Sequence, residues 1–356
     1  MLATKLAAKK TEMKAHKTMQ RVIRLANKTG IVAAVALLGL LMAACGGGST
    51  EKTFCVDSKG NTVPVDDYVC VAVDETFRPV FEVLFADFRD RNAKAFVDPL
   101  YMPEDSAISL LLRDSVRTVV ATRQLTTKEK DYLVGKFNLL AKEAVVAYDA
   151  ITLITNNASL DTLISKDEIQ QIMQGKITDW QQLRHANGQK GKIEIVFDNN
   201  GSSTVRYMKD SLCAGQPPKG NLRAATTNEE LITYVSKKPN TIGVLGVDWV
   251  GNKNDSTRLS FLSDVKIMRV GTKDSDDADD YYQPFQLYIA SGSYPLTRGL
   301  FITSTDPRTR SMQRNFFFYL TDEPNHNNMG QIMILRFSQL LPYMAVQSHN
   351  VVIKRY

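Results

Sequence analysis

The sequence predicts an α/β protein with mainly parallel sheets. Apolar runs typical of strands alternate along the chain with segments whose apolar residues recur at helical spacing. With 356 residues, the chain is long enough for two lobes that each have their own core. Its 44% hydrophobic and 23% charged residues are ordinary for a globular protein, which excludes collagen-like, disordered and multi-span membrane proteins.

The basic charge of the chain is concentrated at its N-terminus. The formal net charge is +6, but residues 1–44 hold eight Lys or Arg and a single acid, Glu12. The rest of the chain therefore has 36 basic and 37 acidic residues. A body that is nearly neutral argues against nucleic-acid binding.

An apolar run from Gly30 to Ala44 follows the basic stretch and precedes Cys45. It is shorter than the roughly 20 residues of a membrane span and has the length of a signal-peptide core. With its small residues before the cysteine, the segment resembles the bacterial lipobox. That resemblance implies a signal peptide over 1–44, lipidation of Cys45, and anchoring in the cell envelope, on the periplasmic side of a bacterial membrane. Met19 is an alternative start, and an N-terminal anchor helix is an alternative interpretation.

Residues 45–70 are predicted to form a flexible tether and a small hairpin that turns at 59–61. A disulfide between Cys55 and Cys70 would suit an oxidising compartment, and two free thiols are the alternative. Cys213 is expected to be a buried thiol. No spacing of Cys and His predicts a metal site, and no cofactor is expected.

From residue 71 onward the elements follow one another in order. A short strand at 71–73 precedes a helix with Pro79 in its first turn, and a second helix follows Pro103. Thr126 opens a further helix with a capping-box pattern, after a strand at 116–122. Next come a strand at 145–154, a helix at 166–175 and a buried strand at 193–197.

The turn after that last strand is the clearest candidate site. It contains Gly201, Ser202, Ser203 and Thr204 and opens a helix. Unpaired N–H groups of a first helical turn, together with hydroxyl donors, suit a small oxyanion. Taken alone, the pattern also fits ordinary N-capping.

Other strand-to-helix turns carry the same kind of residue. Thr76 and Phe77 follow the first strand, and Ser106 begins the second helix. Thr122 and Arg123 end the next strand. Because open α/β sheets bind ligands at the carboxyl ends of parallel strands, we expect these turns to converge.

Five segments, in order, carry a resemblance to a known family: 147–156, 166–180, 200–204, 239–246 and 293–298. The second, which ends in Gly-Lys-Ile-Thr-Asp-Trp, is the most specific. With them, the chain from residue 71 onward resembles the periplasmic phosphate-binding proteins of ABC transporters. The resemblance implies a two-lobed periplasmic-binding-protein fold of type 2 with hinge strands at 145–154 and 287–298. Lobe 1 would comprise 71–148 plus 291–356, and lobe 2 would comprise 149–290.

The resemblance also implies which residues bind the ligand: Thr76, Phe77, Ser106, Gly201, Ser202 and Thr204. The chain departs from the family pattern at three positions. Ser203 replaces the second glycine of the family signature. Arg123 takes the place of an aspartate that accepts the proton of hydrogen phosphate, and Asp198 takes the place of an arginine. We expect Arg123 and Arg206 to supply donors and positive charge, and we expect weaker discrimination against sulfate.

Together these features predict a non-enzymatic, monomeric lipoprotein that captures inorganic phosphate in the cleft between the lobes for an ABC permease. The alternative is a binding or sensing lipoprotein for another oxyanion, such as sulfate, without a dedicated permease. A hydrolase with Ser202 as nucleophile is a third hypothesis. It is disfavoured because the four histidines are scattered and none neighbours a Gly-x-Ser-x-Gly elbow. Asp149 is expected to hold the hinge.

Overall fold

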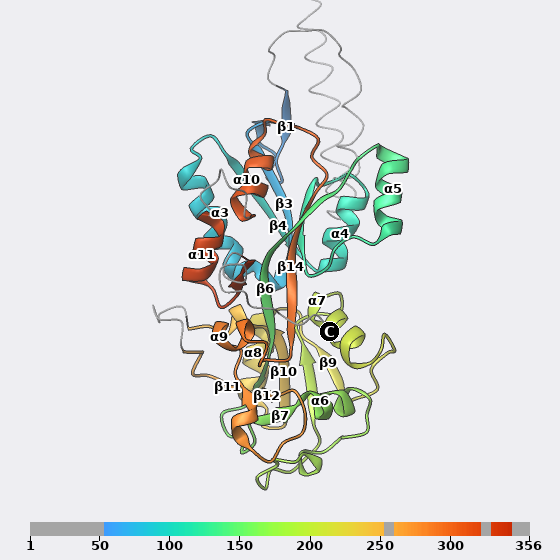
Figure 1. Ribbon diagram of the computed structural model, residues 1–356, viewed down its shortest axis with the longest axis vertical. Coiled ribbons are helices and arrows are strands. Elements are labelled where there is room, and N and C mark those ends of the chain that lie inside the picture. Colours follow the sequence, from blue (N-terminus) through green and yellow to red (C-terminus); the bar gives the residue numbers. More distant parts are fainter. Residues whose placement is uncertain (1–52, 253–259, 322–328, 344–356) are drawn as a thin grey trace, which may run out of the picture. The chain divides into compact units, whose positions relative to one another are not determined.

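The computed structural model describes residues 53–252, 260–321 and 329–343, which belong to one compact unit (Figure 1). The predicted signal peptide and Cys45 lie outside the described residues. Within these ranges, no helix is both long and apolar enough to cross a membrane.

A mixed sheet of ten strands organises the described residues, and it falls into two halves. In the first half, β3 (Tyr68–Asp74) is parallel to β4 (Phe96–Met102) and to β5 (Thr118–Ala121). The strand β14 (Thr297–Ser304) then pairs antiparallel with both β5 and β6 (Lys142–Thr155). The strand β15 (Leu341–Pro342) also pairs with β6.

The second half continues from the other end of β6. There β10 (Thr241–Gly246) pairs antiparallel with β6 and parallel with β8 (Glu194–Phe197), and β8 is parallel to β9 (Leu222–Ala224). A two-residue strand, β11 (Lys266–Ile267), also pairs with β6. A separate sheet joins β7 (Leu163–Ser165), β12 (Arg269–Gly271) and β13 (Tyr281–Tyr282).

The strand β6 belongs to both halves, as Figure 1 shows. Its residues 142–150 pair with β14, and its residues 151–155 pair with β10. The predicted strand at 145–154 is therefore confirmed. The segment expected as the second crossing, 287–298, is not extended throughout. It begins as α9 (Gln286–Ala290), turns at Gly292 with φ +71°, and becomes β14 only at Thr297.

Helices follow the strands as the alternation predicted. The capping box of Thr126 is confirmed: its hydroxyl accepts a hydrogen bond from the Glu129 N–H at the start of α5. Pro79 lies in the first turn of its helix, where a missing N–H costs nothing.

The helices of the first half are α3 (Arg78–Arg91), α4 (Glu104–Leu112), α5 (Thr127–Phe137), α10 (Met312–Leu320) and α11 (Met329–Phe337). Those of the second half are α6 (Lys166–Met173), α7 (Ser203–Leu212) and α8 (Asn228–Lys237). Short 3-10 turns are η2 (Glu75–Phe77), η3 (Trp180–Gln182), η4 (Val247–Trp249) and η5 (Ala278–Asp280).

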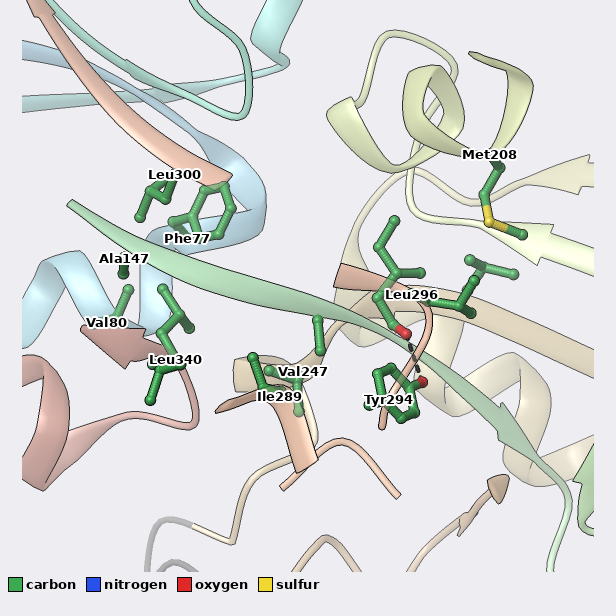
Figure 2. Close-up of a cluster of buried hydrophobic side chains, with 14 of the residues drawn as sticks. Phe77, Val80, Ala147, Met208, Val247, Ile289, Tyr294, Leu296, Leu300 and Leu340 are labelled. Atoms are coloured by element: carbon green, nitrogen blue, oxygen red, sulfur yellow. Dashed lines mark hydrogen bonds between the residues drawn. The ribbon is translucent and has the colours of Figure 1, made fainter. Parts of the chain in front are cut away.

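The largest hydrophobic core continues through both halves along β6. Figure 2 shows part of it, with Ala147 on the first-half side and Met208 on the second-half side. Near the crossing, the Tyr294 hydroxyl donates to the Ile151 carbonyl oxygen at 2.7 Å. A strand covered on both faces is expected to be apolar along most of its length, which explains the β-like run at 145–154.

The predicted hairpin forms, but the disulfide does not. Strands β1 (Phe54–Val56) and β2 (Thr62–Pro64) pair antiparallel, with Gly60 at φ +88° in the turn. Cys70 lies outside the hairpin, in β3, and both it and Cys55 are free thiols, so the expected pairing is corrected. Burial raises the pKa of Cys70 to about 12. Cys213 is a buried free thiol, as predicted.

Candidate functional site

The carboxyl end of β3 brings an acid and a hydroxyl together. Asp74, the last residue of β3, is wholly buried, and its Oδ1 accepts a hydrogen bond from the Thr76 N–H at 3.1 Å. This bond caps η2, so the turn itself fixes the carboxylate. The Thr76 hydroxyl lies 3.5 Å from Oδ2 of Asp198, which follows β8 in the second half. The turn at Thr76 therefore meets the turn after β8, as predicted.

The start of α7 supplies three hydroxyls with three different roles. Ser202 caps the helix, since its Oγ accepts the Val205 N–H at 3.2 Å. Ser203 is fully buried, and its Oγ accepts a hydrogen bond from Arg298. The Thr204 hydroxyl is buried and has no hydrogen-bond partner. Gly201 packs against the first half, where an added Cβ would lie 3.3 Å from Cβ of Pro103.

The cation of the site comes from β14. Arg298 is only 6% exposed, and it lies opposite Asp149 in the register of β14 and β6. Its Nε donates to Asp149 Oδ2 at 2.8 Å, and its Nη1 donates to Ser203 Oγ at 3.0 Å. The guanidinium carbon lies 5.5 Å from the centre of the Phe77 ring. Its Nη2 is buried without a partner.

These residues form what we call the Arg298 cluster: Asp74, Thr76, Asp149, Asp198, Ser203, Thr204 and Arg298. All are buried, and they come from both halves of the sheet. Five of their buried atoms have no hydrogen-bond partner: Asp74 Oδ2, Asp149 Oδ1, Asp198 Oδ1, Thr204 Oγ1 and Arg298 Nη2. Since each unpaired buried polar group costs about 1–3 kcal/mol, the cluster is incomplete as it stands, and a small polar ligand would complete it.

The carboxyl groups of the cluster have raised pKa values. Burial raises the pKa of Asp74 to about 7, with a further rise from the nearby Glu104 charge and an opposing effect from Arg298. Burial also raises the pKa values of Asp149 and Asp198. For Arg298, burial works against the charged form, but Asp149 and Asp74 outweigh it and raise the pKa. The cluster therefore combines a firmly charged cation with carboxyl groups that can exchange protons.

Ser106 and Arg123, both predicted to bind the ligand, have their recorded contacts outside this cluster. The Ser106 side chain is exposed, and its backbone N–H is bound to the Pro103 carbonyl oxygen at 3.0 Å. Arg123 donates from both terminal nitrogens to the two carboxylate oxygens of Glu129, each at 2.8 Å. The structure thus places the Arg123 guanidinium against Glu129, six positions along the chain, and its role as the balancing charge for a ligand stays a prediction.

Thr122 and Arg206 lie where the halves meet, but both are bound to Glu104. The Glu104 carboxylate is fully buried at the first position of α4. It accepts the Thr122 N–H at 2.6 Å, the Thr122 hydroxyl at 2.8 Å and the Arg206 Nε at 2.6 Å. In this turn, Glu104 and not Ser106 contacts the second half of the sheet, through Arg206.

Sequence reasoning missed three residues, and the sequence held a distinguishing signal for two of them. Asp74 directly precedes the predicted turn at Thr76, and an acid in that place is the expected cap of a short helix. Arg298 closes the segment 293–298 that carried part of the family resemblance. Glu104 opens a helix, where acids are common, so its position alone did not distinguish it from an ordinary first-turn acid. Asp149 was expected to hold the hinge, and its ion pair does join β6 to β14.

No group of three or more His, Cys, Asp or Glu side chains is placed to hold a metal ion in the part of the chain that the structure describes. The Arg298 cluster combines hydroxyl and guanidinium donors with carboxyl groups whose pKa values are raised, which is chemistry suited to an oxyanion that carries a proton.

Comparison with known proteins places the chain in a family. Relatives include the phosphate-binding protein PstS of Staphylococcus epidermidis, 26% identical over 207 residues, which are 57% of this chain and 59% of that protein. The matched region thus spans less than two thirds of that relative. The phosphate-binding protein PstS of Bacillus subtilis is 22% identical over 271 residues, covering 76% of this chain and 81% of that protein.

Solved structures agree on the fold. A substrate-binding protein of Clostridium perfringens, solved with bound phosphate, matches with a TM-score of 0.61 at 19% identity, over 77% of this chain and 99% of that one. An ABC-type phosphate transport receptor of Vibrio cholerae matches with a TM-score of 0.56 at 16% identity, over 77% of this chain and 100% of that one. At such low identity these likenesses show the fold alone. The family model described as the PBP superfamily domain matches residues 60–323, and the chain belongs to this superfamily, with its periplasmic-binding-protein fold.

Proposed function

We propose that this protein captures inorganic phosphate in the Arg298 cluster and delivers it to an ABC-type importer. The observation that carries the proposal is the pair of buried donors without partners, Arg298 Nη2 and Thr204 Oγ1, next to carboxyl groups with raised pKa values. The names of the relatives, phosphate-binding proteins, support the same ligand.

The acids give the site a reason to prefer phosphate. Hydrogen phosphate carries a proton that an ionised carboxylate can accept, whereas sulfate is fully ionised at neutral pH. Sulfate would set its charge against Asp74 and Asp198 in a buried site, where like charges repel strongly. Asp74 thus offers the acceptor that was missing at position 123.

Isothermal titration calorimetry with phosphate, arsenate and sulfate tests this assignment. We expect heat with phosphate and arsenate, and at least 100-fold weaker binding of sulfate, because one repulsive buried pair is worth several kcal/mol. Equal binding of sulfate would favour the alternative, a general oxyanion-binding or sensing lipoprotein. Absence of heat with phosphate would contradict the proposal.

The proposed protein is a binding protein and not an enzyme. Ser202, the nucleophile of the hydrolase hypothesis, uses its hydroxyl oxygen to cap α7. His185 is engaged with the Ser275 carbonyl oxygen at 2.8 Å. We expect no turnover of phosphate monoesters or acyl esters by the purified protein. Turnover that is lost in Ser202→Ala would support the hydrolase instead.

The proposed location is the outer side of a bacterial membrane, with Cys45 lipidated and the protein acting as a monomer beside its permease. Metabolic labelling with a fatty acid should mark the protein, and Cys45→Ser should abolish the label. Labelling that persists in Cys45→Ser would contradict the anchor.

A further inference from the structure

A closed ring of hydrogen bonds joins Glu104, Thr122 and Arg206. One Glu104 oxygen accepts the N–H and the hydroxyl of Thr122, at 2.6 and 2.8 Å, and the other accepts Arg206 Nε at 2.6 Å. Arg206 Nη2 then donates to the Thr122 hydroxyl oxygen at 2.7 Å, which closes the ring. Every polar atom of the carboxylate is used, and its side chain is 1% exposed.

The ring crosses from one half of the sheet to the other. Glu104 and Thr122 belong to α4 and to the end of β5 in the first half, whereas Arg206 belongs to α7 in the second. The two bonds of Thr122 to Glu104 lie within the first half and would persist if the halves separated. Only the two bonds made by Arg206 require the halves to be together.

Arg206 is therefore committed to Glu104 in this closed arrangement. Burial alone would raise the pKa of Glu104, but the charge and hydrogen bond of Arg206 and the Thr122 donors outweigh it and lower the pKa. The carboxylate stays ionised, and charge-assisted bonds of this length are among the stronger hydrogen bonds in proteins. An oxyanion that sought Arg206 would first have to displace this carboxylate.

We propose that Glu104, Thr122 and Arg206 form an interlobe clasp, a set of positioning residues that holds the two halves closed and sets the rate of ligand release. Because every hydrogen bond of the clasp runs between groups of the protein itself, the clasp stabilises the closed state whether or not the site is filled. A larger closed fraction raises the apparent affinity for any ligand that binds the closed state. The effect on binding rests on the proposed function, but the effect on closure does not.

The test compares wild type with Glu104→Gln, Arg206→Gln and the double variant in the full chain. In Glu104→Gln, the amide oxygen can still accept hydrogen bonds from Thr122. The amide N–H groups, however, face the N–H donors of Arg206 and cannot accept from them. Closure without ligand is measured from the distance between spin labels at the exposed positions Lys128 and Gln216, with native cysteines changed to serine. Phosphate release is measured by stopped flow.

We expect each single variant to lower the ratio of closed to open molecules about tenfold and to speed phosphate release by a similar factor. The double variant should be no worse than either single one, since both remove the same bonds. Glu129→Gln is the matched control: it weakens the Arg123 pair, which lies within the first half, keeps the capping box, and should change neither measurement.

Three results would overturn the clasp. Tighter phosphate binding by Glu104→Gln would mean that Glu104 competes with the ligand for Arg206. If the double variant lost closure by the sum of the two single effects, Glu104 and Arg206 would act separately. An unchanged label distance would mean that the ring does not control closure. If wild type fails to bind phosphate, the proposed function fails, but the distance measurement still decides on the clasp.

Discussion

Asp74 shows how one side chain can connect ligand choice with protonation. Its carboxylate is wholly buried, has one oxygen without a partner, and lies in a cluster whose cation is already paired with Asp149. An anion placed beside it makes its ionised form still less favourable. A small oxyanion is therefore expected to bind with one proton between itself and this carboxyl group, and hydrogen phosphate brings that proton with it whereas sulfate does not.

The first prediction concerns this coupling. When sulfate binds at pH 8, wild type should take up a proton at Asp74, whereas phosphate binding should take up markedly less, because hydrogen phosphate brings the shared proton with it. Titration calorimetry in two buffers of different ionisation enthalpy measures the proton count directly. Asp74→Asn should bind sulfate more tightly than wild type does, and without proton uptake, because the repulsive charge has gone. Equal proton uptake on sulfate binding by wild type and by Asp74→Asn would show that another group carries the proton.

The second prediction concerns stability against pH in the absence of ligand. The pKa of Asp74 is raised from 3.8 to about 7, so the folded state holds its proton more firmly than the unfolded state does. The resulting stabilisation is complete below about pH 4 and is lost as pH rises through 7. Asp74→Asn should therefore match wild type near pH 4 and exceed it at pH 8 by up to about 4 kcal/mol. Urea denaturation at the two pH values tests this, and an unchanged difference between them would contradict it.

At the scale of elements, the pairing of β6 with β14 is fixed by a buried ion pair. Arg298 and Asp149 face each other directly in the register, and their side chains are 3% and 1% exposed. A shift of one residue would turn Arg298 to the opposite face and leave both charges buried alone. The pair thus selects the register at the place where the two halves connect.

The third prediction follows from this pair. Asp149→Ala should lower the free energy of unfolding by about 3–5 kcal/mol, because it leaves the Arg298 charge buried without its partner. Arg91→Ala is the control, since it removes a surface pair with Asp87 in α3 and should cost less than about 1 kcal/mol. Denaturant unfolding followed by circular dichroism measures both. Similar losses in the two variants would show that the buried pair has no special role.

At the scale of the whole described unit, the two halves meet closely at a glycine. A Cβ on Gly246, at the end of β10, would lie 2.5 Å from Cγ2 of Thr76 in the first half. The backbone of Gly246, at φ −70° and ψ 144°, is open to any residue, so the close approach and not the conformation requires glycine. Nearby, the Trp249 indole donates to the Thr76 carbonyl oxygen at 2.8 Å, which adds a further link between the halves.

The fourth prediction uses that contact to separate closure from folding. Gly246→Ala should weaken phosphate binding about tenfold or more, because the added methyl group keeps the halves from closing fully around Thr76. The denaturation midpoint of Gly246→Ala should change little, since the two halves can move apart and relieve the contact with the added methyl group. Gly135→Ala, at a position of α5 with no atoms near the added Cβ, should leave binding unchanged and add about 0.5–1 kcal/mol of stability. A large loss of stability in Gly246→Ala would show that the closed contact is part of the folding core.

The sequence by itself determined the features that depend on near neighbours. Alternating strands and helices, the capping box at Thr126, the hairpin turn, and the hydroxyl-bearing turns at Thr76 and Ser202 all follow from residues a few positions apart. The tertiary structure alone decided which charges meet. Arg298 finds Asp149 across 149 positions, and Arg206 finds Glu104 across 102, whereas Arg123 is held by Glu129 only six positions away. Such distant pairings cannot be predicted from the local sequence pattern, because they depend on the strand register and on how the two halves meet.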